Sequence, residues 1–157
     1  MKLSNNLSLA EVIKSNTAIR RGIDNTPTDA HIENLKYLAE KVFQPLRDHF
    51  GSSIFVSSGY RSKGLNEAIG GSQRSFHSHG MALDLDQDGR SNSVTNTDLF
   101  YYIKDNLPYS ELIWEFGNED KPDWVHVAIA KGREDEKNAK IAYREEGKTK
   151  YKKWDRD

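Results

Sequence analysis

The chain has 157 residues and a mass of 17.9 kDa, which fits a single domain with a substantial hydrophobic core. Its 23 Lys and Arg residues nearly balance its 24 Asp and Glu residues, and this net charge of −1 argues against a nucleic-acid binder that relies on phosphate contacts. The sequence contains no cysteine, which excludes disulfides, cysteine-ligated metals and thiol nucleophiles, so any metal must be held by the 5 His residues and the carboxylates.

The N-terminal segment, residues 1–13, contains no apolar run long enough for the core of a signal peptide. No stretch of the sequence approaches the roughly 18 apolar residues that a transmembrane helix requires. We therefore expect a protein that is made and folded in the cytoplasm without a signal peptide and without membrane insertion.

The first third of the sequence predicts helices. Ser8 and Glu11 have the spacing of a capping box and predict a short helix that begins at this point. Residues 16–28 contain Gly, Asn, Asp and Pro, which predict turns. Apolar residues then recur at helical spacing over residues 28–49 and predict a longer helix, which Pro45 should kink or re-cap.

Short elements follow in the middle of the chain. An apolar run behind a glycine predicts a strand over residues 53–57. Residues 62–69 predict a short helix, which Gly70 and Gly71 terminate. Over residues 80–86, Met and Leu side chains alternate with Ala and Asp, and this alternation predicts a strand with one apolar face and one polar face.

The last third predicts a helix over residues 96–106 and two strands over 112–116 and 124–130, joined as a hairpin by a polar loop. Residues 131–157 contain ten Lys and Arg and seven Asp and Glu, a net charge of +3, and predict a charged, solvated helix or a frayed end. We expect residues 1–130 to form one domain, to which the C-terminal extension belongs unless it is partly disordered. Because helices precede most of the strands, the order predicts an α+β fold with an antiparallel sheet.

Histidines and an aspartate beside the predicted strands form a candidate metal site. His77 precedes Asp84 by seven residues, and His126 lies within the last predicted strand. Two neutral imidazoles and one carboxylate, with a fourth position left for water, are a suitable ligand set for catalytic zinc. The spacing alone is common, however, and a solvated loop histidine with a turn aspartate is the ordinary alternative. His79 is a second candidate for the position of His77.

Residues 84–89 match the first half of a calcium-binding EF-hand loop. The twelfth position of that loop would be Thr95, where a bidentate Glu is needed, and the preceding segment predicts a strand instead of a helix. We therefore interpret Asp88 and Gly89 as a simple turn.

Short motifs stand in a fixed order along most of the chain, from about Leu7 to Ile129. They are Ser57-Ser-Gly-Tyr-Arg-Ser62, Leu65-Asn66, Gly70-Gly-Ser72, Ser75-x-His77-x-x-Gly80-x-Ala82-x-Asp84 and Trp124-Val-His-Val127. Together they resemble the M15 peptidase family, the group of zinc D-Ala-D-Ala carboxypeptidases and phage L-alanyl-D-glutamate endopeptidases. Two upstream segments, Ile23-Asp-Asn-Thr-Pro27 and Pro45-Leu-Arg47, are similar to its small phage-type members.

The resemblance implies an α+β fold of the Hedgehog/D-Ala-D-Ala peptidase type, in which helices flank an antiparallel sheet that carries a zinc site. His77, Asp84 and His126 are the implied zinc ligands, because the register of the motif selects His77 over His79. Arg61 is the implied substrate-binding residue, and its fixed positive charge would stabilise the oxyanion that develops in the transition state. Further substrate-binding candidates are Tyr60, Ser72, Gln73 and Ser75.

The implied mechanism also needs a carboxylate that takes a proton from the attacking water and passes it to the leaving amine. Many family members have a Glu three residues before the last histidine, where this sequence has Asp123. Residues three apart on a strand point to opposite faces, so Asp123 could serve only if it still belongs to the turn.

The alternative base is Glu115, a carboxylate in an otherwise apolar strand, where burial is costly without a purpose. It would share a face with His126 if the hairpin pairs these two residues directly. Small phage-type relatives resemble its Leu-Ile-x-Glu pattern. We take Glu115 as the base and Asp123 as the second candidate; the ordinary alternative for Glu115 is a surface acid at the strand edge.

The resemblance thus implies a Zn²⁺-dependent peptidase that hydrolyses an amide bond in peptidoglycan stem peptides, as an endolysin-like endopeptidase or a D,D-carboxypeptidase. Such an enzyme acts at the bacterial cell wall after release from the cytoplasm, and the positive tail would be attracted to this anionic surface. We expect a monomer with a peptidoglycan peptide as its substrate and no nucleic-acid partner. The alternative is a non-catalytic, zinc-stabilised wall-binding or structural module on the same fold.

Overall fold

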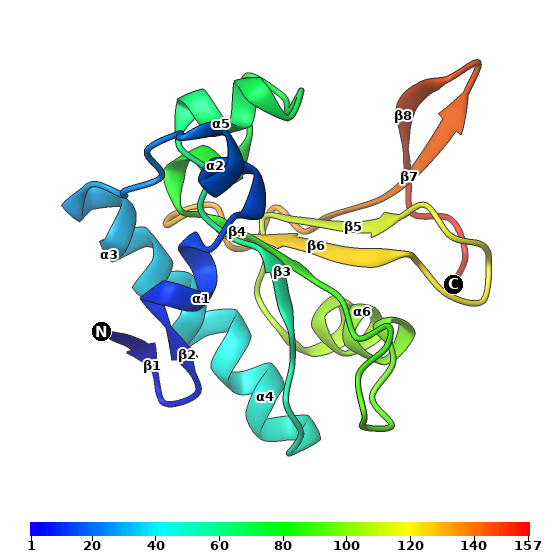
Figure 1. Cartoon of the computed structure of the whole chain (residues 1–157). Coiled ribbons are helices and arrows are strands. Elements are labelled where there is room, and N and C mark those ends of the chain that lie inside the picture. The colour runs from blue at the N-terminus through cyan, green and yellow to red at the C-terminus, as the bar shows by residue number, and fades with distance from the viewer.

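A computed structural model describes residues 1–157 and has an α+β fold (Figure 1). Its main sheet contains six strands: β3 (Val56–Ser58), β4 (Ala82–Leu85), β5 (Glu111–Glu115), β6 (Trp124–Ala128), β7 (Asn138–Glu145) and β8 (Lys148–Lys153). They lie in the order β3-β4-β6-β5-β7-β8, and all neighbours are antiparallel except β5 and β7, which are parallel. A separate small hairpin precedes the sheet and contains β1 (Lys2–Ser4) and β2 (Leu7–Ser8).

The helices lie on both sides of this sheet. They are α1 (Leu9–Ile13), α2 (Asn16–Arg21), α3 (Asp29–Leu38), α4 (Gln44–Phe50), α5 (Lys63–Ala68) and α6 (Asn96–Asn106), with a π turn η1 (Ala39–Phe43) and a 3₁₀ turn η2 (Phe76–His79). In Figure 1, α6 lies below β5 and β6, and α5 lies above the opposite end of the sheet. None of the helices combines the length and the apolar character needed to cross a membrane.

The two faces of the main sheet differ in chemistry because side chains alternate along each strand. One face is apolar and joins the hydrophobic core through Leu83, Leu85, Leu112, Trp114, Val125, Val127 and Ile141. The registers of neighbouring strands gather polar residues on the other face, here called the site face: Asp84, His126 and Lys140 lie in one row across it together with the apolar Ile113. The predicted alternation of the strand over residues 80–86 is thereby confirmed.

The predicted helix over residues 28–49 is a run of three helical segments, α3, η1 and α4. Thr28 caps its start, since its hydroxyl accepts a hydrogen bond from the His31 amide at 3.2 Å. Pro45 cannot donate a backbone hydrogen bond and crowds the preceding turn, and the helix widens into the π turn η1 just before it. The predicted perturbation at Pro45 therefore takes the form of a π turn.

Most of the other predicted helices are confirmed, including the one over residues 62–69 and the one over 96–106. The capping box is confirmed too, because the Ser8 hydroxyl accepts a hydrogen bond from the Glu11 amide at 3.3 Å. The prediction of turns over residues 16–28 is wrong for its first part, which forms α2. A serine cap at its start and a left-handed glycine at its end stabilise this short helix.

The prediction of a charged helix or frayed end over residues 131–157 is wrong. This segment forms the hairpin of β7 and β8, and β7 pairs in parallel with β5, so the hairpin extends the main sheet. After β8 the chain returns to the core, where the Trp154 ring lies 5.3 Å from Trp114 and 4.6 Å from Phe100 between centroids. Ile141 and Ala142 are buried in the middle of β7, whereas Arg144 and Glu145 near its end are exposed, and this explains how so charged a segment joins the sheet.

Candidate metal centre

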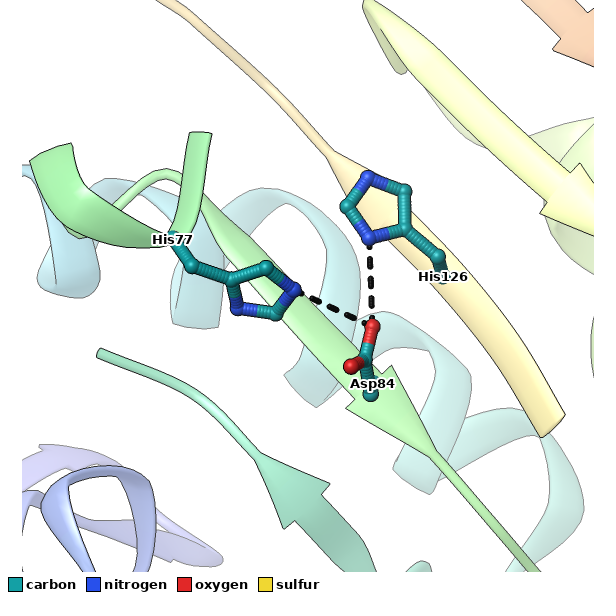
Figure 2. Close-up of side chains that lie close together, drawn as sticks. All are labelled: His77, Asp84 and His126. Carbon is teal, nitrogen blue, oxygen red and sulfur yellow. Dashed lines mark hydrogen bonds and ion pairs between the residues drawn. The ribbon is translucent and has the colours of Figure 1, made fainter. Parts of the chain in front are cut away.

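Three buried side chains from separate elements converge on the site face: His77 from η2, Asp84 from β4 and His126 from β6 (Figure 2). The atoms that could bind a metal all lie within 4.8 Å of one another. Both imidazoles point at the same carboxylate oxygen. The Nε2 atom of His77 lies 3.2 Å from Oδ1 of Asp84, and the Nδ1 atom of His126 lies 3.1 Å from it.

Local structure fixes each of these positions. The register of β4 and β6 places Asp84 directly opposite His126. In η2, the Ser75 hydroxyl accepts a hydrogen bond from the amide of His77 at 3.2 Å. Gly80 ends this turn with a φ of +73°, and a Cβ there would lie 2.5 Å from a backbone carbonyl oxygen of α3. Only glycine tolerates both the positive φ and the absence of space for a Cβ, so Gly80 permits the close turn that presents His77 to the strand.

The outer nitrogen of each imidazole faces an acceptor of its own. The Nδ1 atom of His77 lies 2.6 Å from the carbonyl oxygen of Gly59, and the Nε2 atom of His126 lies 2.8 Å from Oε1 of Glu111. Lys140 in turn donates to Oε2 of Glu111 at 2.9 Å. Metal-binding histidines characteristically donate their second N–H in this way, which leaves the inner nitrogen free for the metal. With a metal bound, the N–H of each ring would lie on the outer nitrogen.

The electrostatics of the group favour a cation. Burial lowers the pKa of His77, so its ring is neutral and its single N–H goes to Gly59. Burial by itself would raise the pKa of Asp84, but the two imidazoles hold it well below its usual range. Burial likewise opposes charge on His126, yet its hydrogen bonds to Asp84 and Glu111 raise its pKa to about 9. Two imidazoles and a carboxylate that attract positive charge fit a zinc ion with one open position.

Arg61 lies beside this group, and its side chain is only 16% exposed. Its guanidinium donates to Oδ2 of Asp84 at 3.1 Å, to the Ser58 hydroxyl at 3.1 Å and to Oδ1 of Asn66 at 3.3 Å. An arginine has five N–H donors, so these three contacts fix the guanidinium and leave two donors for another group. Arg61 is therefore a preorganised cation at the edge of the metal site.

A cavity of about 440 Å³ opens above the metal-binding group. Its walls come from the segment after α5, from η2, from the site face and from the β7–β8 hairpin. Glu115 lines this cavity although it is only 8% exposed, and burial raises its pKa to about 7. A carboxyl group with this pKa can both accept and donate a proton near neutral pH.

The direct pairing of Glu115 with His126 that the sequence analysis considered is not present. Ile113 stands opposite His126, and Glu115 stands opposite Trp124. The residue opposite His126 is thus two positions from Glu115 along β5, so Glu115 lies on the same face of the sheet as His126. Asp123 lies in the loop just before β6, where it is exposed and does not line the cavity.

The structure brings two of the four further substrate-binding candidates to the cavity. Ser72 and Ser75 both line it. Tyr60 is instead 5% exposed, belongs to the hydrophobic core and packs against His31 at a tilted angle, with 5.0 Å between ring centroids. Gln73 is exposed and lines a neighbouring hollow of the surface.

Sequence reasoning missed Glu111, Lys140 and Arg144, which also line the cavity. A signal for Glu111 was present, because residues 111 and 115 are separated by two strand periods and therefore share a face. The two basic residues belong to the C-terminal segment whose strands were not predicted, so their placement could not be found from the sequence pattern.

The sequence model of the family described as peptidase M15 matches residues 5–128. The chain belongs to the peptidase M15 family. M15 peptidases are zinc-dependent hydrolases, and the matched residues include the His77, Asp84 and His126 group that could hold the metal. A search of curated proteins gave no significant match. The β7–β8 hairpin lies outside the part of the chain that matches the M15 family.

Proposed function

We propose that the protein is a zinc metallopeptidase that hydrolyses an amide bond in peptidoglycan stem peptides at the bacterial cell wall. It acts as an endolysin-like endopeptidase or as a D,D-carboxypeptidase, it is monomeric, and its sheet and helices form the Hedgehog/D-Ala-D-Ala peptidase type of fold. The observation that carries this proposal is the position of Glu115, a buried carboxyl group in the same cavity as the metal-binding residues.

Each polar group around the cavity has a role in this reaction. Zinc held by the His-Asp-His group would supply a Lewis acid for the scissile carbonyl. Arg61 directs its two free N–H groups toward the oxygen on which negative charge develops. The carboxylate of Glu115 accepts a proton from the attacking water and then donates it to the nitrogen of the leaving amine. Its pKa of about 7 supports both steps at neutral pH.

The test measures bound zinc and cleavage of purified peptidoglycan in the wild type and three variants. His77→Ala should lose zinc and activity together. Glu115→Gln should retain zinc and lose activity by about 10²- to 10⁴-fold, the usual contribution of a general base. Asp123→Asn is the matched control, since it makes the same change outside the cavity, and it should retain both zinc and activity.

The outcomes separate the alternatives. A wild-type protein that binds zinc but cleaves nothing would overturn the peptidase proposal in favour of a non-catalytic, zinc-stabilised module. Full activity in Glu115→Gln with loss in Asp123→Asn would transfer the role of the base to Asp123. Mass spectrometry of the products distinguishes the two enzymes, because only a D,D-carboxypeptidase releases free D-Ala.

A further inference from the structure

One wall of the cavity comes from the β7–β8 hairpin, which lies outside the residues matched to the M15 family. Arg144 on β7 and its cross-strand neighbour Thr149 on β8 both line the cavity, as does Tyr151. In Figure 1 this hairpin rises at one end of the sheet, beyond β5. The residues of this wall therefore extend the site beyond the part of the chain that matches the family.

An aromatic residue in an unusual conformation supports this wall. Phe116 follows β5 with a φ of +58°, in the left-handed region that non-glycine residues rarely occupy. In a regular strand it would follow Glu115 onto the opposite, apolar face of the sheet. Instead, Phe116 lines the cavity, and its ring lies 5.5 Å from that of Trp124 between centroids. The backbone strain thus serves to place an aromatic surface beside the site.

Arg144 rests on this aromatic surface. Its guanidinium carbon lies 4.3 Å from the centroid of the Phe116 ring, which is a cation–π contact. Arg61 and Lys140 are ion-paired with Asp84 and Glu111, whereas Arg144 has no carboxylate partner within the protein. A planar guanidinium that is held by stacking, with its N–H groups unused, is suited to bind a carboxylate through two hydrogen bonds.

The charges around the cavity favour the same type of ligand. Four basic and three acidic side chains line it: Arg61, Arg74, Lys140, Arg144, Asp84, Glu111 and Glu115. Burial keeps Glu115 partly protonated near neutral pH, which increases the excess of positive charge. Because a cleft with this excess attracts anions, an acidic peptide is favoured over a neutral or basic one.

We propose that Arg144, supported by Phe116, binds a carboxylate of the peptide substrate at the hairpin side of the cavity and makes the enzyme selective for acidic peptides. The inference rests on the proposed peptidase function and adds to it a specificity-determining residue on the C-terminal hairpin. The substrate places its scissile amide above the metal-binding group and a carboxylate against Arg144, so that the C-terminal hairpin determines which peptides are accepted.

The experiment compares three synthetic stem peptides with the wild-type protein and its variants. The parent peptide has all its carboxyl groups free, the second has its internal carboxyl group amidated, and the third has its C-terminal carboxyl group amidated. We would measure kcat/KM for the zinc-loaded proteins, and the Kd of each peptide by calorimetry with metal-stripped protein, which reports binding without turnover. Arg144→Gln removes the charge, and Arg144→Lys retains it without the planar fork.

Lys150→Gln is the matched control. Lys150 lies on the same hairpin, and its substitution removes the same charge. It is the cross-strand neighbour of Tyr143, so its side chain points to the opposite face of the hairpin from Arg144. Both positions are exposed, so neither substitution should prevent folding.

The wild type should prefer the parent peptide to one of the two amidated peptides by about 10- to 100-fold, the usual effect of a hydrogen bond to a charged group. Arg144→Gln should abolish this preference, Arg144→Lys should restore part of it, and Lys150→Gln should leave it unchanged. The amidated peptide that is disfavoured identifies which carboxylate Arg144 binds.

Equal losses on all three peptides in Arg144→Gln, or the same loss in Lys150→Gln, would overturn the inference. If the wild type cleaves none of the peptides, the peptidase proposal fails, and the dissociation constants then decide separately about Arg144. A preference in binding that disappears in Arg144→Gln would support the carboxylate site, and equal binding of the three peptides would refute it.

Discussion

The burial of Glu115 should destabilise the folded protein at neutral pH, and Glu115→Gln should remove this cost. The ordinary pKa of the group is 4.5 and its pKa in the folded protein is about 7, so the difference, 7 − 4.5, is about 2.5 units. At about 1.4 kcal/mol per unit, this difference amounts to about 3 kcal/mol. The folded state binds the proton more tightly than the unfolded state. The contribution of this group to stability is therefore fully present below pH 4.5 and is lost as the pH rises to about 7.

Urea unfolding of metal-stripped wild type and Glu115→Gln at two pH values measures this effect. At about pH 8 the variant should be more stable by about 3 kcal/mol, and at about pH 5 this gain should be smaller by about 2 kcal/mol. Glu111→Gln is an informative control with the opposite sign. Burial opposes charge on Glu111, but His126 and Lys140 lower its pKa to about 2, so this substitution should destabilise the protein by a similar amount at both pH values and lose its effect only as the pH falls below 4.5.

A Glu115→Gln variant that is no more stable than the wild type at either pH would refute this reasoning. It would mean that the carboxyl group is hydrated in solution and that its position in the cavity imposes no electrostatic cost. The same variant should lose most of its activity, so the expected result is a protein that is more stable but a much poorer catalyst, as is typical when a functional group is retained at a cost in stability.

Three further predictions concern the surroundings of the site. Glu111→Gln and Lys140→Met should each weaken zinc affinity by about 10- to 100-fold, because the contacts of Glu111 and Lys140 orient the ligand His126. Competition with a chromophoric chelator measures this affinity, and an unchanged affinity would show that the orientation of His126 does not depend on these contacts. Gly80→Ala should cost about 2 kcal/mol or more and lower the Tm by about 4 to 8 °C. Gly89→Ala, with a φ of +75° but no atom near the added Cβ, should cost less, and equal losses would show that the close contact at Gly80 is unimportant. Trp154→Ala should destabilise the protein by about 2 kcal/mol in urea unfolding, because it removes the aromatic contacts that hold the C-terminus. An m value smaller than that of the wild type would show that the β7–β8 hairpin detaches before the rest of the protein unfolds.

Local patterns in the sequence predicted most of the helices because their causes lie within a few residues. The cap at Ser8 and the proline at position 45 act on their own turns, and both effects are present in the structure. The segment 138–153 was different, because β7 pairs with β5, more than twenty residues earlier, and β8 pairs with β7. Its many Lys residues favour solvent exposure in any conformation, and a composition of this kind does not reveal a partner strand that is distant in sequence.

The prediction for the metal ligands depended on the order of motifs, whereas the prediction for the base depended on strand geometry. Glu115 lies on the site face although it does not pair directly with His126, because a register shift of two residues leaves every side chain on the same face. Contacts between particular residues depend on the register between strands, and local sequence patterns do not predict that register. The hydrogen bond between Glu111 and His126 requires the observed alignment of β5 with β6, and that between Lys140 and Glu111 requires the parallel alignment of β7 with β5. The residues of β5 and β6 that face the cavity therefore follow from alternation alone, but the residues that orient the metal ligands follow only from the pairing of three strands.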